Sequence, residues 1–263
     1  MKRSDDENYH GLVAETYDLF RGDDPVEPEP WFQFYKRRLD ERPGVALEPA
    51  CGTGRILLPL LKAGYDIEGA DSSSEMLSIC RRKAALMGLD PTLYEQYMQE
   101  LDLQKLYTTI LIPLGSFILI AQRQEAVEAL RRFCAHLVTG GQLVFSMPTP
   151  SARSLANPSD NNDEWGEPNT IVRPTDGATI TIKCTRSSDR LEQLHTSRQH
   201  YELRKDGELL MAEEHLSITR WYGKYEMIMM LEMAGFRNIR VFGNHTDEEA
   251  TLESFARVYW AEK

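Results

Sequence analysis

The stretch that most constrains this chain is residues 45–55, which read VALEPACGTGR. A short apolar run is followed by an acid at Glu48, a turn of small residues, and a second apolar run. The first run has the length of a buried strand, and the spacing of the second predicts a helix over residues 56–62. Glycine lets a backbone approach a ligand closely, and the free amides of a helix N-terminus favour an anionic group. The stretch therefore predicts a strand–turn–helix unit that binds a ligand at its turn.

Two acids narrow the identity of that ligand. A dinucleotide site has a G-x-G-x-x-G turn, whereas this turn has only two glycines and the bulky Leu57 at the third position. A carboxylate at Glu48 repels a pyrophosphate but suits the amino group of an amino-acid-like ligand. Asp71 ends a second predicted strand and lies 71 − 48 = 23 positions later, where a carboxylate can hold a ribose diol. The alternative for Asp71 is a cap of the helix predicted over residues 75–87.

The acid and the CGTG turn resemble motif I of the class I S-adenosylmethionine-dependent methyltransferases. Ala50 stands where that class commonly has its first glycine. The resemblance covers residues 9–147 well and 221–260 loosely, and it implies S-adenosylmethionine as cofactor and S-adenosylhomocysteine as product. It also implies cofactor contacts at the turn, at the second acid, and on the loops after the third and fourth strands. These residues are Glu48, Ala50, Cys51, Gly52, Gly54, Arg55, Asp71, Ser72, Met76, Met98, Gln99, Pro113, Leu114 and Phe117.

Two further departures from the class lie on the loops after the third and fourth predicted strands. Tyr97 stands where an acid commonly holds the adenine, with Gln99 or Glu100 as substitutes. Residues 112–117 read IPLGSF where members that methylate bases or glutamine carry [DN]-P-P-[YF]. This argues against such substrates and is compatible with a small-molecule acceptor. For Phe117 the alternative is packing in the core.

Residues 9–20 have a helical apolar spacing and precede a second helix predicted over 31–39. Tyr9 and Tyr17 match aromatic positions of the lids in sugar-amine N-methyltransferase-like members, and the alternative is that both rings pack the helix onto the core. His10 adjoins Tyr9 and is our candidate general base for an amine or hydroxyl nucleophile. The alternative for His10 is an exposed position at a helix start. Four further histidines are weaker candidates: His195, His200, His215 and His245.

The strands and helices predicted from the apolar spacing of the remaining residues indicate an α/β fold. Strands are expected over residues 91–97, 107–112, 142–147, 236–242 and 253–260, and helices over 122–137 and 224–234. The resemblance implies a seven-stranded Rossmann-like sheet in the order 3-2-1-4-5-7-6 with helices on both faces. After strand five, residues 178–186, 191–203 and 208–219 alternate with period two, with Asp206-Gly207 as a hairpin turn.

We therefore expect two parts. Residues 1–149 and 218–263 form the Rossmann-like domain, with an N-terminal helical lid over 1–43. Residues 150–217 form an inserted three-stranded antiparallel subdomain, which serves as a substrate cover or a dimer interface.

Charge and cysteine usage limit the partners. The formal net charge of -11 argues against a nucleic-acid partner. The four cysteines are far apart and form no C-x-x-C, which is typical of reduced cytosolic thiols and argues against a zinc site. No apolar run has the length of a membrane span or forms a signal peptide. We expect a cytoplasmic protein, monomeric or homodimeric, with no membrane partner and no metal.

The main hypothesis is an enzyme that transfers a methyl group from S-adenosylmethionine to a nitrogen or oxygen atom of a small-molecule acceptor. The alternative is a non-catalytic regulatory protein that binds S-adenosylmethionine or S-adenosylhomocysteine. Tyr97 and the missing [DN]-P-P-[YF] keep this alternative open. A nicotinamide-dependent oxidoreductase is a third hypothesis, and it depends on the partial glycine turn alone.

Overall fold

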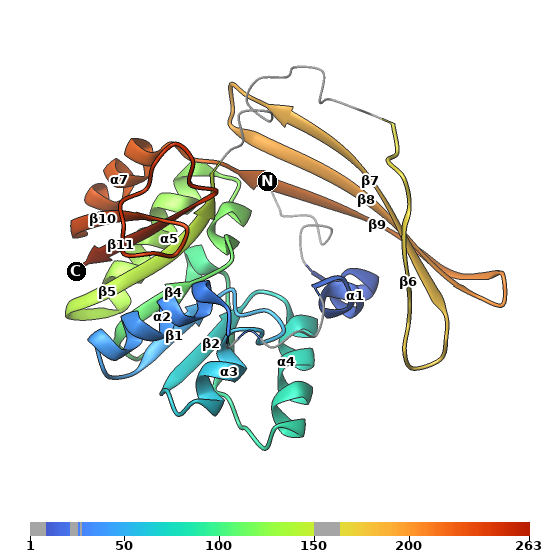
Figure 1. Ribbon diagram of the computed structural model, residues 1–263, viewed down its shortest axis with the longest axis horizontal. Helices are drawn as coiled ribbons and strands as arrows, with labels where there is room; N and C mark the ends of the chain where they lie inside the picture. Colours follow the sequence, from blue (N-terminus) through green and yellow to red (C-terminus); the bar gives the residue numbers. More distant parts are fainter. Residues whose placement is uncertain (1–8, 22–25, 27, 150–163) are drawn as a thin grey trace. The chain divides into compact units, whose positions relative to one another are not determined.

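The computed structural model describes residues 9–21, 26, 28–149 and 164–263. By its internal contacts the chain divides into two units, Met1–Asp24 with Ser151–Trp221 and Pro25–Pro150 with Tyr222–Lys263. We call the first the small unit and the second the large unit (Figure 1). Within the described residues, no helix has the length and apolar character needed to span a membrane.

A seven-stranded sheet forms the centre of the large unit. Its strands are β1 (Ala46–Pro49), β2 (Ile67–Asp71), β3 (Leu93–Glu95), β4 (Tyr107–Ile112), β5 (Leu137–Pro148), β10 (Arg237–Gly243) and β11 (Ala256–Glu262). Their order is β10-β11-β5-β4-β1-β2-β3. β11 runs antiparallel to both of its neighbours, β10 and β5, and the other adjacent pairs are parallel. This confirms the predicted order 3-2-1-4-5-7-6, with β11 as the seventh strand and β10 as the sixth.

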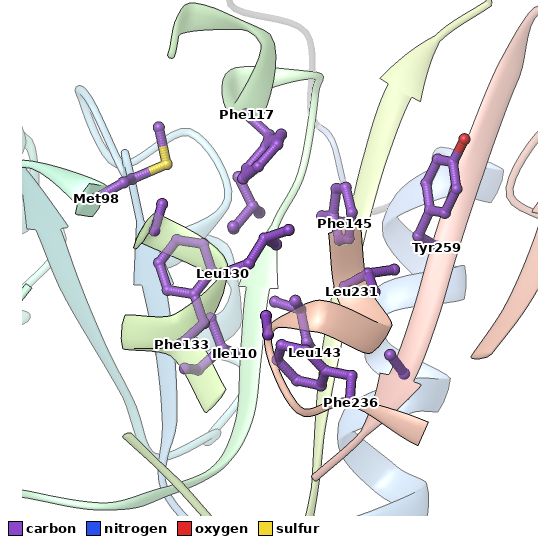
Figure 2. Close-up of a cluster of buried hydrophobic side chains, with 14 of the residues drawn as sticks. Met98, Ile110, Phe117, Leu130, Phe133, Leu143, Phe145, Leu231, Phe236 and Tyr259 are labelled. Atoms are coloured by element: carbon purple, nitrogen blue, oxygen red, sulfur yellow. The ribbon is translucent and has the colours of Figure 1, made fainter. Parts of the chain in front are cut away.

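Alternation along the central strands explains why helices cover both faces of this sheet. In β4, Ile110 and Ile112 belong to one buried cluster, whereas Leu111 belongs to another. The first cluster contains apolar side chains of α5 (Arg123–His136) and α7 (Lys224–Met233). The second contains those of α2 (Pro30–Glu41), α3 (Leu57–Lys62) and α4 (Ser74–Leu86). Figure 2 shows the first cluster, in which Phe133 of α5 and Leu231 of α7 lie beside side chains of the sheet.

Strand β5 is longer than predicted, and the reason lies in two glycines. We expected a helix over residues 122–137 and a strand over 142–147, with Gly140-Gly141 as the turn between them. The helix instead ends at His136 and the strand begins at Leu137, with both glycines inside it. Gly140 has a φ of 74°, and the register with β4 shifts between Tyr107 and Thr109. The glycines therefore accommodate an irregularity within the strand.

The small unit contains a four-stranded antiparallel sheet and one helix. The strands are β6 (Asn169–Val172), β7 (Thr179–Asp189), β8 (Leu194–Lys205) and β9 (Glu208–Arg220), in that order across the sheet. We expected three strands, and β6 was missed because its four residues lie at the end of a polar stretch. The predicted hairpin turn is confirmed, since Asp206 and Gly207 both have positive φ, 51° and 84°.

Helix α1 (Gly11–Arg21) packs on this sheet. Leu12 and Val13 join a buried cluster with side chains of β7 and β8 and with Ala178 just before β7. The Glu213 carboxylate of β9 accepts a hydrogen bond from the amide of Leu12 at 2.8 Å, which satisfies a free donor at the helix start. Helix α2 belongs to the large unit, so the segment that we expected to form one lid over residues 1–43 divides between the two units.

Candidate functional site

The glycine turn after β1 is held by backbone hydrogen bonds and by one carboxylate. The amide of Cys51 donates to the carbonyl of Ala70 at 3.0 Å, and the amide of Gly54 donates to the carbonyl of Cys51 at 2.9 Å. Gly52 and Gly54 have φ values of 54° and 79°. A Cβ on Gly54 would lie 2.6 Å from Sγ of Cys80 on α4. Glycine is therefore required at position 54 both by backbone conformation and by close packing.

Ala50 also has a positive φ, 59°. This is the position at which the resembled class commonly has its first glycine. The conformation costs an alanine about 1–2 kcal/mol, whereas a glycine adopts it without penalty. The departure at Ala50 thus keeps the backbone shape of the turn at an energetic cost.

Asp71 lies at the end of β2 and connects the turn to α4. Its Oδ2 accepts a hydrogen bond from the amide of Gly52 at 2.8 Å, and its Oδ1 accepts one from the amide of Ser73 at 2.9 Å. Burial raises the pKa of Asp71, and bonds from the amides of Ser73, Gly52 and Ser72 oppose this. Ser73 caps α4 by accepting from the amide of Met76 at 3.1 Å. The cap therefore comes from Ser73, and Asp71 is left to face the turn.

Glu48 is a buried acid behind the same turn, with only 2% of its surface exposed. Burial raises the pKa of Glu48 well above its usual range, the Asp71 charge raises it further, and a bond from the amide of Leu57 opposes both. Its Oε2 has no hydrogen-bond partner among the described residues. A buried acceptor without a partner is costly, and a cationic ligand group would satisfy it.

Three further predicted contact residues of the large unit, beside Cys51 of the turn itself, are Arg55, Met98 and Gln99. Burial raises the pKa of Cys51 well above its usual range, so its thiol stays neutral. The Arg55 guanidinium lies 6.0 Å from the ring centre of Trp31. Met98 and Gln99 are buried in a short 3-10 helix, η2 (Met98–Glu100).

The loop that follows η2 is held by hydrogen bonds between the Gln96 side chain and the backbone of Asp102. Gln96 accepts from the amide of Asp102 at 2.8 Å and donates to the Asp102 carbonyl at 3.3 Å, so Asp102 occupies a fixed turn.

The loop after β4 contains a tight turn and a core residue. Leu114 and Gly115 have φ values of 57° and 82°, and the amide of Ser116 reaches the carbonyl of Pro113 at 3.4 Å. The Leu114 side chain is 44% exposed. Phe117 is fully buried, and its ring packs 5.2 Å from that of Phe145 (Figure 2). This contact is the core packing that we weighed as the alternative for Phe117.

The three N-terminal candidates lie together in the small unit. The rings of Tyr9 and Tyr17 meet edge to face at 5.6 Å, and Tyr9 lies 5.9 Å from the ring of His215 on β9. The carbonyl of His10 accepts from the amides of Val13 and Ala14 at the start of α1. Its Nε2 is buried and has no hydrogen-bond partner within the part of the chain that the structure describes.

Two buried polar residues whose side chains are hydrogen-bonded to each other, Tyr35 and Ser146, were missed by the sequence reasoning. Tyr35 of α2 is fully buried, and Ser146 of β5 is 3% exposed. Their only sequence signal is a polar group on an otherwise apolar helix face or strand, which is too common to indicate a site. No cluster of metal-ligating side chains occurs among the described residues.

Comparisons with known proteins agree with this geometry. Residues 46–141 match the family model of a methyltransferase domain. A curated relative, dTDP-3-amino-3,6-dideoxy-alpha-D-glucopyranose N,N-dimethyltransferase from Streptomyces fradiae, is 30% identical over 140 residues. The match covers 52% of this chain and 53% of the relative, so the chain spans about half the length of that protein.

Solved structures resemble the whole chain. An S-adenosylmethionine-dependent methyltransferase from Clostridium acetobutylicum has a TM-score of 0.74 at 20% identity, over 95% of this chain and 96% of that one. A sugar N-methyltransferase from a Streptoalloteichus species has a TM-score of 0.71 at 20% identity, over 100% and 99%. At these identities the likeness shows the fold.

Proposed function

We propose that this chain, a member of the class I S-adenosylmethionine-dependent methyltransferases, transfers a methyl group to an amine nitrogen of a small-molecule acceptor. The observation that carries the proposal is a pair of acids on both sides of a glycine turn, the buried Glu48 and the partly buried Asp71. The matched methyltransferase domain, residues 46–141, contains this pair.

The residues of the turn fit S-adenosylmethionine. Glu48 offers to the ammonium group of the cofactor its Oε2, which has no hydrogen-bond partner among the residues that the structure describes. Asp71 retains lone pairs on both carboxylate oxygens for the ribose hydroxyls, beside the amides that it already accepts. Gly52 allows close approach of the backbone, and Met98 with Gln99 is proposed to hold the adenine. When bound, the cofactor supplies a methyl group on a positively charged sulfur.

The protein contributes mainly positioning to such a reaction. The chain must hold the acceptor nitrogen in line with the methyl group and keep water away. The acceptor nitrogen loses a proton, and His10 is our candidate base for it, since its Nε2 is without a partner among the described residues. Tyr9 and Tyr17 remain proposed cofactor contacts, and the inserted subdomain is proposed as a substrate cover.

The relatives favour an amine on a sugar-like molecule as the acceptor. The Streptomyces fradiae protein is named for an amino sugar, and the Streptoalloteichus protein for sugar N-methylation. The wider hypothesis of methyl transfer to a nitrogen or oxygen atom also covers a hydroxyl group as the acceptor. The comparisons support an enzyme over the regulatory alternative. We further propose that the protein acts in the cytoplasm without nucleic acid, as a monomer or homodimer.

Calorimetric titration tests the cofactor first. We expect S-adenosylmethionine and S-adenosylhomocysteine to bind and NAD to have no effect. Ligand at about 100 times its dissociation constant adds about 2.7 kcal/mol to the free energy of unfolding. Methyl transfer is then measured with labelled cofactor and a panel of amino sugars. Binding without transfer to any amine or hydroxyl acceptor would favour the regulatory protein, and binding of NAD alone would contradict the family assignment of the site.

A further inference from the structure

The phenol of Tyr259 on β11 is a buried donor without an acceptor in the described chain. Its side chain is 0% exposed, and its hydroxyl oxygen has no hydrogen-bond partner among the described residues. The centres of its ring and that of Phe145 lie 5.1 Å apart, and Figure 2 shows the hydroxyl pointing away from Phe236. Burial raises the pKa of Tyr259 to about 12, so the phenol keeps its proton at neutral pH. Buried hydroxyls are nearly always hydrogen-bonded, so this donor requires an explanation.

Other polar groups on this face of the sheet are already paired. The hydroxyl of Tyr222 donates to a backbone carbonyl at 3.4 Å. Glu226 of α7 accepts from the amide of Gly223 at 3.2 Å and pairs with Arg123 at 3.4 Å. We therefore look for the acceptor of the Tyr259 proton in a ligand.

A second hydroxyl without a partner lies further along the same face. Arg257 of β11 pairs with Met147 of β5, and the ladder continues beyond β5, because the amide of Thr149 donates to the carbonyl of Phe255 at 2.9 Å. Alternate residues of a strand share a face, so Arg257 and Thr149 lie on the face that α5 and α7 cover, with Tyr259. Oγ1 of Thr149 is buried and also has no hydrogen-bond partner in the part of the chain that the structure describes.

Arg257 lies between these two hydroxyls along the ladder. No carboxylate of the described residues forms an ion pair with it. A guanidinium has N–H donors and no acceptor, so Arg257 cannot take the proton of Tyr259. Two hydroxyls and a guanidinium thus offer donors from neighbouring positions of one sheet face. The group that satisfies such donors together is an oxyanion, that is, a carboxylate or a phosphate.

These side chains lie at the edge of the sheet that contains the glycine turn. β1, β4 and β5 run parallel, so their carboxyl ends share one edge. A Cβ on Gly115, in the loop after β4, would lie 3.1 Å from Cδ of Pro148 at the end of β5. Phe117 of the same loop packs 5.2 Å from Phe145. The group around Tyr259 therefore adjoins the loop after β4, in which we predict cofactor contacts.

We propose that Tyr259, Arg257 and Thr149 form a subsite that binds an oxyanion of the acceptor, a carboxylate or a phosphate. Tyr259 and Thr149 donate their hydroxyl protons to its oxygens, and Arg257 supplies the positive charge. The inference rests on the proposed function, in which an acceptor binds beside the cofactor. The subsite selects acceptors that carry a negative charge as well as an amine.

Anion titrations test the subsite. The parent protein, saturated with S-adenosylhomocysteine, is titrated with inorganic phosphate and separately with acetate, each against sodium chloride at the same ionic strength. Binding is followed by the melting temperature, which a ligand of the folded state raises. We expect at least one anion to raise it, and the responding anion identifies the group as a phosphate or a carboxylate. Tyr259→Phe removes only the hydroxyl and should weaken binding of that anion about tenfold, since a hydrogen bond to a charged group is lost.

Two arginine variants separate the subsite from a general charge effect. Arg257→Gln should lose anion binding by more than the phenol variant. Arg240→Gln is the matched control, because Arg240 lies 4.6 Å from the ring centre of Phe242, whose cluster is on the other face of the sheet. It removes the same charge and should bind the anion like the parent. Tyr259→Phe should melt no lower than the parent without anion, because it removes a buried group that lacks a partner.

Several outcomes would overturn the inference. These are no response of the parent to either anion, unchanged anion affinity in Tyr259→Phe, a lower melting temperature of that variant without anion, and equal losses in Arg257→Gln and Arg240→Gln. A parent that does not bind S-adenosylhomocysteine contradicts the proposed function instead. The same anion titrations without S-adenosylhomocysteine then decide whether the subsite exists, so the two failures are distinguished.

Discussion

Asp71 uses both of its carboxylate oxygens on the backbone of its own unit. One oxygen accepts from Gly52 in the turn and the other from Ser73 at the start of α4. The same side chain is proposed to hold the ribose hydroxyls, so a single substitution affects both stability and binding. The apolar pattern before Asp71 predicted its place at the end of β2, and the 23-residue separation from Glu48 indicated the ribose role, but the sequence contains no sign that it also organises the turn.

Asp71→Ala should therefore show two effects. Two amides lose their acceptor in partly buried hydrogen bonds, which we expect to lower the free energy of unfolding by about 1 kcal/mol for each amide that finds no other partner. Binding of S-adenosylhomocysteine should weaken about tenfold or more by calorimetry. Asp102→Ala is the control, since this exposed turn is held through its backbone by Gln96, and it should bind like the parent. Unchanged affinity in Asp71→Ala would show that the ribose site is misplaced.

Gly54 and Gly64 provide a matched pair for the packing of the turn. Both have positive φ, 79° and 90°, but an added Cβ would meet Cys80 and Leu58 at Gly54 and nothing within 4 Å at Gly64. Both alanine variants incur the conformational cost of about 1–2 kcal/mol. Gly54→Ala should lose about 1–3 kcal/mol more through overpacking, measured by urea unfolding. Equal losses would mean that the turn relaxes around the methyl group.

Helices and strands with a regular apolar spacing were predicted from the sequence, whereas a short strand and an irregularity within a strand were missed. The strand order was implied by the resemblance to the class I methyltransferases, which the glycine turn and the two acids carried. Strand β6 escaped because four residues contain too few alternations to separate them from a loop. Glycine is common both after the end of a helix and at an irregularity within a strand. The sequence alone therefore did not show that Gly140 and Gly141 lie inside β5. The grouping of α1 with the antiparallel sheet depends on contacts between distant residues, which no local pattern reports.

Glu213 tests that grouping at the start of α1. Glu213→Ala removes the acceptor for the amide of Leu12, and we expect a loss of about 1 kcal/mol in the free energy of unfolding. Glu214→Ala, on the next residue, removes an exposed carboxylate 3.5 Å from Arg198. A pair so exposed contributes little, so Glu214→Ala should be close to neutral. If the two variants melt alike, the cap does not hold α1.

For the whole molecule, the raised pKa of Glu48 links folding, ligand binding and pH. The unfolded chain loses this proton near pH 4.3, whereas the folded protein retains it until the pH reaches the raised pKa. The stability that Glu48 contributes is therefore present below pH 4.3 and is lost as the pH rises through the folded pKa. A bound cation favours the ionised form and offsets this loss.

Binding of S-adenosylmethionine should accordingly release protons. Titrations at about pH 6 in two buffers with different ionisation enthalpies should give different apparent binding enthalpies, and the difference counts the protons released. Glu48→Gln cannot ionise, and we expect it to release fewer protons and to bind more weakly. The same variant should be more stable than the parent without ligand at neutral pH. Identical proton release by parent and variant would remove Glu48 from the binding step.

The bond between Leu12 and Glu213 spans 201 residues of chain, and this separation determines when the small unit can form. Translation proceeds at about 5–20 residues per second, so α1 waits roughly 10–40 s after its synthesis for the strand that caps it. A helix of 11 residues is marginal in water without tertiary contacts. The large unit is interrupted by the same insertion and needs its last two strands as well. Neither unit can therefore be completed before most of the chain has left the ribosome, and the nascent protein exposes the apolar face of α1 for that whole interval.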